Sequence, residues 1–318
     1  MNISEKMCAT TNLRALKKGS ASRPGCDLYK LADEQKVFGR AYVIVAFAVL
    51  YLTWGSTFLG IRLAIQSIPP GIMAGMRSIV AGTLVYSFLR VRGGVSRPSA
   101  RDWRIALLLG AGIISVGNGS LTYSERFIPS GTAAVILAPM PAMMAVMGWF
   151  AGITEKPPAA VWIGIILATC GVAIVVHPGG LTASREQLWS VGLLLAGETI
   201  WSATSLYAGR VRQNCSPFMM ASMQMLCSGA LMLSFALVHG EFTEFNVKSV
   251  TMRSVAAMAY LTLTGSVIGY LAYIWLLRNL EATRVATHAY VCPVLALLLG
   301  WIVAGERLAA DLLTGAFW

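Results

Sequence analysis

The stretch that decides the fold is Trp54–Leu89, WGSTFLGIRLAIQSIPPGIMAGMRSIVAGTLVYSFL, because the chain contains it twice. An offset of 147 residues places it, without a gap, on Trp201–Ala236, WSATSLYAGRVRQNCSPFMMASMQMLCSGALMLSFA. The alignment contains twelve identities, which include one paired Trp and one paired Pro. Apolar helices use few residue types, so the paired Trp and Pro are more informative than matches of Leu or Ala. We interpret the two stretches as an internal duplication.

The composition excludes an ordinary soluble domain. Of 318 residues, 56% are apolar and only 12% are charged, and the mean hydropathy is +0.66. Soluble domains contain about 25% charged residues. The net charge of +11 does not indicate a nucleic-acid partner, because the Lys and Arg residues lie at the ends of long apolar runs, as membrane proteins require.

Nine apolar runs are long enough to cross a bilayer, for which a helix needs about 20 residues. They are separated by short connections rich in Pro and Gly, which leave no room for a soluble domain. Pro139, Pro141 and Pro293 lie inside runs and predict kinked helices. The runs cover residues 41–61, 71–90, 103–123, 130–150, 158–177, 187–208, 216–239, 254–277 and 285–304.

The distribution of Lys and Arg predicts the orientation of the chain. With the N-terminus inside, 18 basic residues fall on the inner side and 6 on the outer side. The positive-inside rule therefore predicts a cytoplasmic N-terminus. Residues 1–40 are expected to form a basic cytoplasmic tail without stable structure.

The duplication and the orientation together predict an inverted repeat. Trp54 lies on the first run and Trp201 on the sixth, so the two copies are five helices apart and have opposite topology. With an offset of 152, Arg126 also matches Arg278, and Pro141 matches Pro293. Inverted repeats are a recurring architecture of secondary transporters, with the substrate site near the midplane between the halves.

The predicted fold is an all-α membrane bundle of ten helices, five plus five, in which the tenth helix is incomplete. The first repeat covers residues 41–177 and the second covers residues 187–318. Leu308–Trp318 contains eleven residues, which form only about 16 Å of helix and cannot span a bilayer. Either the chain is truncated or a partner supplies the missing half-helix, and we favour truncation.

Four stretches resemble the EamA-type exporters of the drug/metabolite transporter superfamily. They are WGSTFLGIR (54–62), PPGIMAGMR (69–77), GNGSLTYSERFIPSGTAAVILAPMPA (117–142) and AYVCPVLALLLGWIVAGERL (289–308). The resemblance is closest to the YedA-like inner-membrane members, and it covers about residues 41–318. It implies a five-plus-five bundle with a central cavity that exports amino acids or related small metabolites. Glu198 departs from the pattern, because a small polar residue is expected there.

Two charged residues, Arg77 and Glu198, lie well inside apolar runs. A charge at mid-membrane depth usually faces a cavity or a partner. By helical rise, Arg77 lies about 10 Å and Glu198 about 16 Å from the same side of the membrane, so we expect the two to pair. A carboxyl caught between burial and a nearby Arg can change protonation. Glu198 is therefore the predicted site of proton coupling, with a purely structural ion pair as the alternative.

Polar and aromatic side chains at similar depth are the candidates for substrate binding. A polar group in hydrocarbon must find a partner, which favours Asn118 and His288, whereas Trp and Tyr near run ends often serve as interfacial anchors. His288 could equally be a hydrogen-bonded core residue. Tyr207 and Tyr273 lie at similar depth but are not among the predicted substrate-binding residues. The predicted substrate-binding residues are Trp54, Asn118, Tyr123, Trp201, Tyr270, His288 and Tyr290.

The sequence does not favour an enzyme. The runs contain no paired acids and no nucleophile with a base, and the six Cys show no metal-ligand spacing. No metal or other cofactor is predicted. The expected partners are a small-molecule substrate and the lipid bilayer, with no nucleic acid, and a homodimer is left open. The predicted function is gradient-driven export across the inner membrane. The alternatives are a channel, a lipid flippase or an inactive truncated copy.

Overall fold

The computed structural model describes residues 40–93, 97–176, 184–280 and 282–305. The chain divides into two compact units, residues 1–45 and 46–318. Within the described part of the first unit lies only the start of the helix α3. The predicted basic tail and the predicted incomplete tenth helix, residues 308–318, lie outside the described residues.

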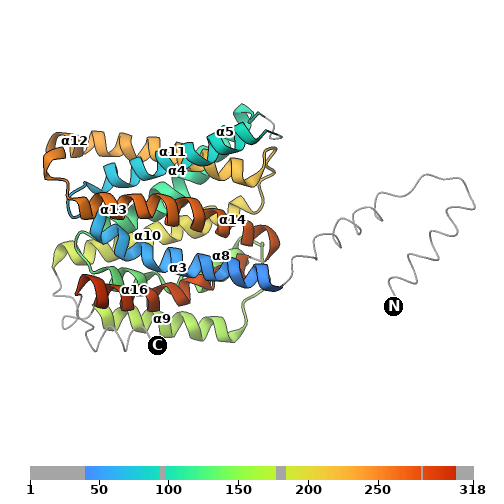
Figure 1. Cartoon of the computed structure of the whole chain (residues 1–318). Helices are drawn as coiled ribbons and strands as arrows, with labels where there is room; N and C mark the ends of the chain where they lie inside the picture. The colour runs from blue at the N-terminus through green and yellow to red at the C-terminus, as the bar shows by residue number, and fades with distance from the viewer. Residues whose placement is uncertain (1–39, 94–96, 177–183, 281, 306–318) are drawn as a thin grey trace, which may run out of the picture. The chain divides into compact units, whose positions relative to one another are not determined.

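All regular secondary structure in the described ranges is helical, and a helix lies at each of the nine predicted runs (Figure 1). The elements are α3 (Arg40–Ala64), α4 (Pro70–Arg92), α5 (Ala100–Leu109), η1 (Gly110–Asn118), α6 (Gly119–Ser124), α7 (Ser130–Leu137), α8 (Met140–Phe150), α9 (Ala159–Val176), α10 (Arg185–Ala208), α11 (Pro217–Val238), α12 (Glu241–Glu244), η2 (Val247–Ser249), α13 (Met252–Tyr260), η3 (Leu261–Gly269), α14 (Tyr270–Asn279), α15 (Ala282–Val285) and α16 (His288–Ala304).

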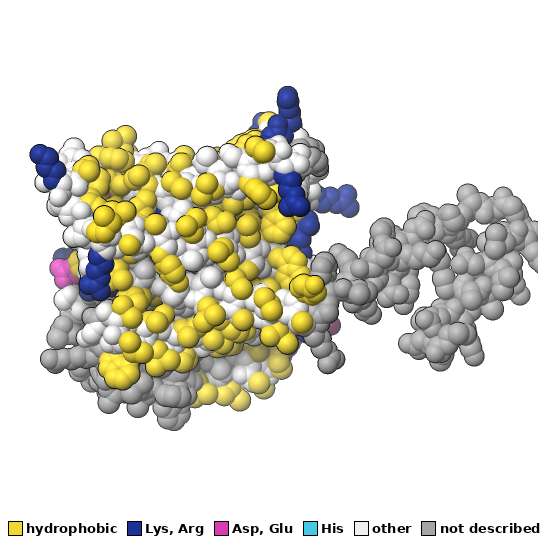
Figure 2. Space-filling view, viewed as in Figure 1, with side chains coloured by type: hydrophobic (Ala, Val, Ile, Leu, Met, Phe, Trp, Pro, Cys, Tyr) yellow, Lys and Arg dark blue, Asp and Glu magenta, His cyan; other side chains and the backbone are white. Residues whose placement is uncertain are grey.

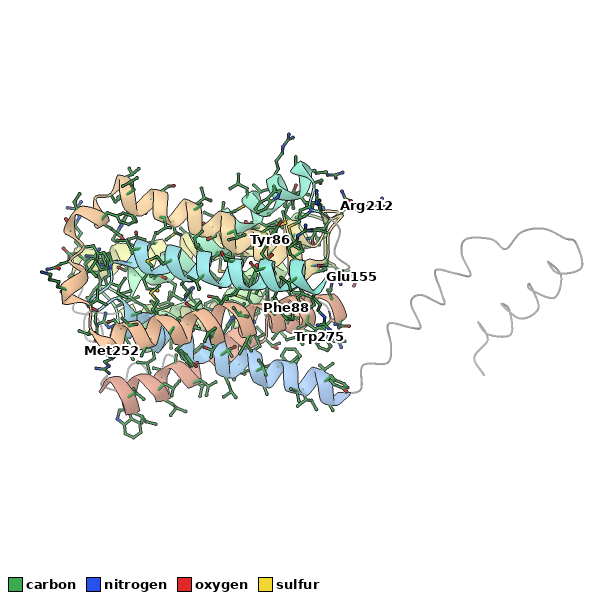
Figure 3. The ribbon with its side chains drawn as sticks, turned by 45° about the horizontal axis from the view of Figure 1, so that its top comes forward. Tyr86, Phe88, Glu155, Arg212, Met252 and Trp275 are labelled. Atoms are coloured by element: carbon green, nitrogen blue, oxygen red, sulfur yellow. The ribbon has the colours of Figure 1, made fainter. Side chains whose placement is uncertain are left out.

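Six helical segments of the described chain are long and apolar enough to cross a membrane: Ala41–Ala64, Pro70–Arg92, Ala100–Ser124, Ser130–Phe150, Pro217–Val238 and Met252–Asn279. The helices α9, α10 and α16 occupy the other three predicted runs. The visible face in Figure 2 is covered by hydrophobic side chains, and Lys and Arg gather at the two ends of the helices. In Figure 3, Arg212 lies at one end of the bundle, and Met252, the first residue of α13, lies at the other end. Such a surface suits a hydrocarbon environment with charged groups at its edges.

The prolines predicted to kink helices act in two ways. Pro139 lies between α7 and α8, at the point where the run 130–150 is broken. Pro141 then falls in the first turn of α8, where a missing N–H costs little. Pro293 stays inside α16, which continues past it to Ala304.

Two wide helical turns, η1 and η3, have π-helical hydrogen bonding and were not predicted from the sequence. Each lies in the middle of a membrane-length segment, between α5 and α6 in one case and between α13 and α14 in the other. Their bounds differ by 151 residues, close to the offset of 152 found in the sequence. Segments of π-helix are rare and occur frequently at functional sites.

The helices α4 and α11 pack backbone to backbone through glycine. A Cβ added to Gly82 would lie 2.9 Å from the backbone nitrogen of Leu226, and one added to Gly229 would lie 2.8 Å from that of Ile79. Gly82 corresponds to Gly229, and Ile79 to Leu226, by the offset of 147. The contact is therefore reciprocal, with each copy of the sequence offering the same surface to the other. Small residues allow this close approach in membrane helices.

Both copies also place a tryptophan against the π-helix of the other copy. A Cβ on Gly117 of η1 would lie 2.6 Å from the Trp201 ring, and a Cβ on Gly269 of η3 would lie 2.8 Å from the Trp54 ring. Trp54 and Trp201 correspond by the offset of 147, and the two glycines by 152. These crossed contacts bring α3, α10, η1 and η3 together around the middle of the bundle.

Candidate functional site

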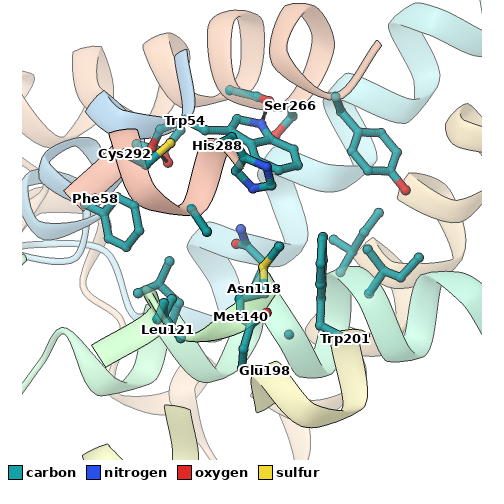
Figure 4. Close-up of a pocket in the computed structure, with 18 of the residues that line it drawn as sticks. Trp54, Phe58, Asn118, Leu121, Met140, Glu198, Trp201, Ser266, His288 and Cys292 are labelled. Carbon is teal, nitrogen blue, oxygen red and sulfur yellow. Dashed lines mark hydrogen bonds between the residues drawn. The ribbon is translucent and has the colours of Figure 1, made fainter. Parts of the chain in front are cut away.

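The two copies meet around a cavity of about 150 Å³ (Figure 4). In Figure 4, Trp54, His288 and Cys292 lie on one side of this cavity, and Glu198 and Trp201 lie on the other. Its walls come from α3, α4, η1, α6, α7, α8, α10, α11, η3, α14 and α16. The cavity therefore contains groups from both halves of the chain.

Arg77 brings a positive charge to the cavity wall from α4. Its side chain is only 5% exposed, and its Nη2 donates a hydrogen bond of 2.7 Å to Oδ1 of Asn118, the last residue of η1. Within the described part of the chain, its Nε has no hydrogen-bond partner. Arg77 is thus held in place by an amide and keeps an unused donor.

Glu198 brings a carboxyl group to the same cavity from α10. The side chain is 9% exposed, and its Oε1 is buried without a hydrogen-bond partner among the described residues. The predicted direct pair with Arg77 is not formed between these two described side chains, because Arg77 contacts Asn118 on the adjacent η1 instead. The site therefore holds two charged groups that face one cavity and do not neutralise each other by contact.

Aromatic rings form part of the remaining wall. The Trp54 ring centroid lies 4.9 Å from that of Tyr273 and 4.9 Å from that of His288. Trp201 lies 5.9 Å from Tyr273 across the same cluster. The His288 Nδ1 is 2.9 Å from the backbone oxygen of Val285, so a neutral His288 that donates there leaves its Nε2 as an acceptor.

A second buried hydrogen bond holds the cavity residue Tyr270 to Gln224, which lies outside the cavity lining. The Tyr270 hydroxyl donates to the Oε1 of Gln224, linking α14 to α11. Both side chains are buried. The bond satisfies two polar groups that would otherwise be costly in hydrocarbon.

Most of the predicted site residues share this cavity. Seven of them line it: Trp54, Arg77, Asn118, Glu198, Trp201, Tyr270 and His288. Two lie elsewhere. Tyr290 is 55% exposed on the outer surface of α16, and the Tyr123 hydroxyl donates to the Glu241 carboxylate, which also accepts from the backbone nitrogens at the start of α4. Depth along a helix places these two residues near the site, but their helix faces turn them away from it.

Several residues of the cavity wall are not among those predicted from the sequence. Cys292 follows His288 by four residues on one helix, so the i, i+4 rule could have found it. Tyr273 does not line the cavity itself but packs against the Trp54 and Trp201 rings, which do. Ser266 lies on η3, where the wide π-turn shifts the register, and Met140 follows the break at Pro139. No simple pattern in the sequence marks these last two.

The sequence model of the EamA-like transporter family matches this chain over residues 41–177 and again over residues 188–317. The chain is 34% identical, over 83% of each chain, to the uncharacterized inner membrane transporter YedA of Escherichia coli strain K12. It is 25% identical to the probable terminal-alkyne amino-acid exporter of Streptantibioticus cattleyicolor, over 82% of this chain and 85% of that one.

A solved crystal structure shares the fold. Its TM-score with this chain is 0.62 at 18% sequence identity, over 88% of this chain and 94% of the other. At that identity the likeness concerns the fold alone. The names of the sequence relatives and the apolar helices together indicate a multi-pass protein of the inner membrane.

Proposed function

Because the chain belongs to the EamA-like transporter family, we propose that it is a secondary active exporter of amino acids or related small metabolites. The observation that carries this proposal is the cavity in which Arg77 and Glu198 present opposite charges without pairing. A free amino acid carries the same two charges, a carboxylate and an ammonium group. The relative named as an amino-acid exporter supports the same substrate class.

The size of the cavity favours a small substrate. Its volume of about 150 Å³ is well below the roughly 300–1,000 Å³ of sites for drug-sized ligands. In our proposal the Arg77 guanidinium, which Asn118 orients, binds the substrate carboxylate, and the rings of Trp54, Trp201, Tyr270 and His288 enclose the remainder. A guanidinium suits this role because its donors match the geometry of a carboxylate.

We propose that the bundle is a ten-helix inverted repeat that works by alternating access. The crossed contacts of Trp54 with Gly269 and of Trp201 with Gly117 support this architecture. The reciprocal packing of α4 on α11 and the two separate matches of the family model support it as well. In this architecture residues 41–177 and 187–318 form the two repeats. The excess of Lys and Arg on one side favours a cytoplasmic N-terminus.

Glu198 is the proposed site of proton coupling. A buried carboxylate without a partner is unfavourable, so a proton or another cation must accompany it when the cavity is closed. A proton that binds from the outside and leaves to the inside would drive outward movement of the substrate. The coupling would then depend on which side the cavity faces.

The test is transport in proteoliposomes by Glu198→Gln and by the native chain. We expect labelled amino acid to show saturable counterflow in both, because counterflow needs no net proton movement. Export driven by a proton gradient should survive only in the native chain. Linear, non-saturable flux would indicate a channel instead of a carrier. Export by Glu198→Gln with unchanged dependence on the gradient would remove Glu198 from the coupling.

A further inference from the structure

We infer that Tyr123 and Glu241 form a latch that holds the cavity closed toward the outside. The latch consists of the Tyr123 hydroxyl, the Glu241 carboxylate and the backbone N–H groups of Gly71 and Ile72 at the start of α4. This inference rests on the proposed alternating access and adds a gate for one side of the membrane. It also gives a function to Tyr123, which was predicted to bind substrate but does not line the cavity.

The first observation is that several donors meet on one buried carboxylate. The Glu241 Oε2 accepts from the backbone nitrogen of Gly71 at 2.9 Å and from that of Ile72 at 3.1 Å. The Tyr123 hydroxyl donates to Oε1 at 2.5 Å, and Glu241 is only 8% exposed. Hydrogen bonds to an ionised acceptor are stronger than neutral ones, and a negative charge is favourable at a helix N-terminus. The contact is therefore strong for a single side chain.

The second observation is that α4 has no cap of its own. Pro69, at the N-cap position, has no side-chain acceptor, and Pro70 has no N–H, so the first donors that need a partner belong to Gly71 and Ile72. A Cβ on Gly71 would collide with the Tyr123 hydroxyl and with the Glu241 carboxylate. The start of α4 thus accommodates an acid and a tyrosine from elsewhere in the chain, and it does so because residue 71 is glycine.

The third observation is that the second copy has no equivalent of this contact. The helix α11, the counterpart of α4, is capped by the side chain of Ser216, which accepts from the backbone nitrogen of Met219. In the proposed inverted repeat, equivalent positions lie at opposite ends of the bundle, so the latch acts at one end only. The offsets of 147 and 152 match its parts to residues of different chemistry: Gly71 to Phe218, Glu241 to Gly94 and Tyr123 to Trp275.

The latch lies at the end of the bundle that faces outward in the proposed orientation. The helix α12 begins with Glu241 and lies between α11 and α13, and Met252, the first residue of α13, marks this end of the bundle in Figure 3. With a cytoplasmic N-terminus, the seventh run, which contains α11, crosses from the inside to the outside. The end of α11 and the whole of α12 are therefore on the outer side.

The latch joins two groups of helices. Glu241 follows the end of α11 by three residues, and α11 packs on α4 backbone to backbone, so α4, α11 and α12 form one group. Tyr123 belongs to α6, whose next residue, Ser124, donates to the backbone oxygen of Ser190 on α10 at 3.0 Å. The helix α6 thus belongs with α10. The π-helix η1 directly precedes α6, and helices bend at such turns, so α6 can separate from α4 once the latch is broken.

Separation of the two groups at this end exposes the cavity, because Leu121 of α6 and Met225 of α11 both line it. An exporter takes up its substrate from the inside, and an outer end that opened at the same time would leave a continuous pore. A contact that exists only at the outer end, and only while that end is closed, favours the state that can take up substrate. No covalent, redox or proton-transfer step is involved.

The experiment uses Cys292 as the reporter of opening, because this residue lines the cavity and is only 4% exposed. Right-side-out membrane vesicles that contain the full chain are treated with a membrane-impermeant maleimide, and peptide mass spectrometry follows the labelling of Cys292. We expect Glu241→Gln to raise the labelling rate about tenfold, since the charged acceptor is lost. Tyr123→Phe removes one donor and should raise the rate roughly threefold.

Two further variants separate the latch from a general effect of substitution. Glu244→Gln is the matched control, because Glu244 is exposed at the end of the same short helix, and its labelling should equal that of the native chain. Gly71→Ala leaves both polar side chains intact but places a methyl group against them, so it should raise labelling as well. In inside-out vesicles none of these variants should raise the labelling of Cys292, whereas general loosening would raise it from both sides.

The remaining outcomes are also decisive. Unchanged labelling from the outside in a folded Glu241→Gln overturns the latch, and so does an equal rise from both sides. If the thermal unfolding midpoint shows that Glu241→Gln does not fold, Tyr123→Phe and Gly71→Ala are used in its place with the same criteria. Counterflow of a labelled amino acid by the native chain tests the proposed function separately. Counterflow without any effect of the variants on Cys292 labelling would overturn the latch alone, whereas the expected labelling without counterflow would overturn the carrier.

Discussion

The hydrogen bond between Arg77 and Asn118 has a counterpart in the other half of the molecule, between Gln224 and Tyr270. The offset of 147 relates Arg77 to Gln224, and the offset of 152 relates Asn118 to Tyr270. Both bonds join the second helix of a copy to its π-containing segment. The two bonds therefore join equivalent positions, but the donor is Arg77 of α4 in the first copy and Tyr270 of α14 in the second, and only the first donor is charged. Equivalent positions thus carry an asymmetric charge distribution, and the proposed substrate binding depends on that difference.

The largest effect should come from making the first half resemble the second. Arg77→Gln keeps an amide that can bond to Asn118 but removes the positive charge. We expect substrate transport to fall roughly 100-fold, equivalent to about 2.8 kcal/mol, because the proposed contact with the substrate carboxylate loses its charge. The measurement is kcat/KM for counterflow. Arg92→Gln, at the exposed end of the same helix, is the matched control and should transport normally.

A smaller effect, of the same size at both sites, should follow from disturbing the crossed Trp–Gly contacts. Gly117→Leu and Gly269→Leu each insert a side chain where a tryptophan ring lies within 3 Å of the added Cβ. We expect each to destabilise the protein by about 1–3 kcal/mol, the usual range for overpacking.

The thermal unfolding midpoint in detergent reports this change. Gly192→Leu serves as the control, because a Cβ on Gly192 meets nothing within 4 Å. A loss of stability in only one of the two tryptophan contacts would contradict their equivalence.

The smallest effect should appear in the neutral hydrogen bond. Tyr270→Phe leaves the buried Gln224 oxygen without its donor, and we expect a loss of roughly 0.5–1.5 kcal/mol in unfolding free energy. Adding Gln224→Met should restore most of it, since removing both partners of a neutral bond is nearly neutral. The stability lost in Asn118→Leu should not be restored in the same way by an apolar neighbour, because Arg77 keeps its buried charge. Full recovery of stability at the Arg77–Asn118 bond would show that the two hydrogen bonds are equivalent.

The comparison also shows how far the sequence could predict the site. Seven predicted residues line the cavity because charged and polar groups at mid-membrane depth have few stable places to lie. Tyr123 and Tyr290 were misplaced because depth alone does not identify a helix face. In a soluble protein, the polar face of a helix would resolve this ambiguity. In a bilayer, the lipid-facing surface is as apolar as the interior, so the pattern around Tyr290 carries no such signal.

By itself, the sequence determined the helical membrane class, the positions of the helical runs and the internal duplication. These follow from the length of apolar runs needed to cross a bilayer and from paired residues at a constant offset. Only the tertiary structure decided that Arg77 contacts Asn118 and that Oε1 of Glu198 has no hydrogen-bond partner among the described residues. It also decided that η1 and η3 widen at equivalent places to receive Trp201 and Trp54. The reason is that such contacts depend on which helix faces meet, and between helices in lipid that is set by close packing, not by hydropathy.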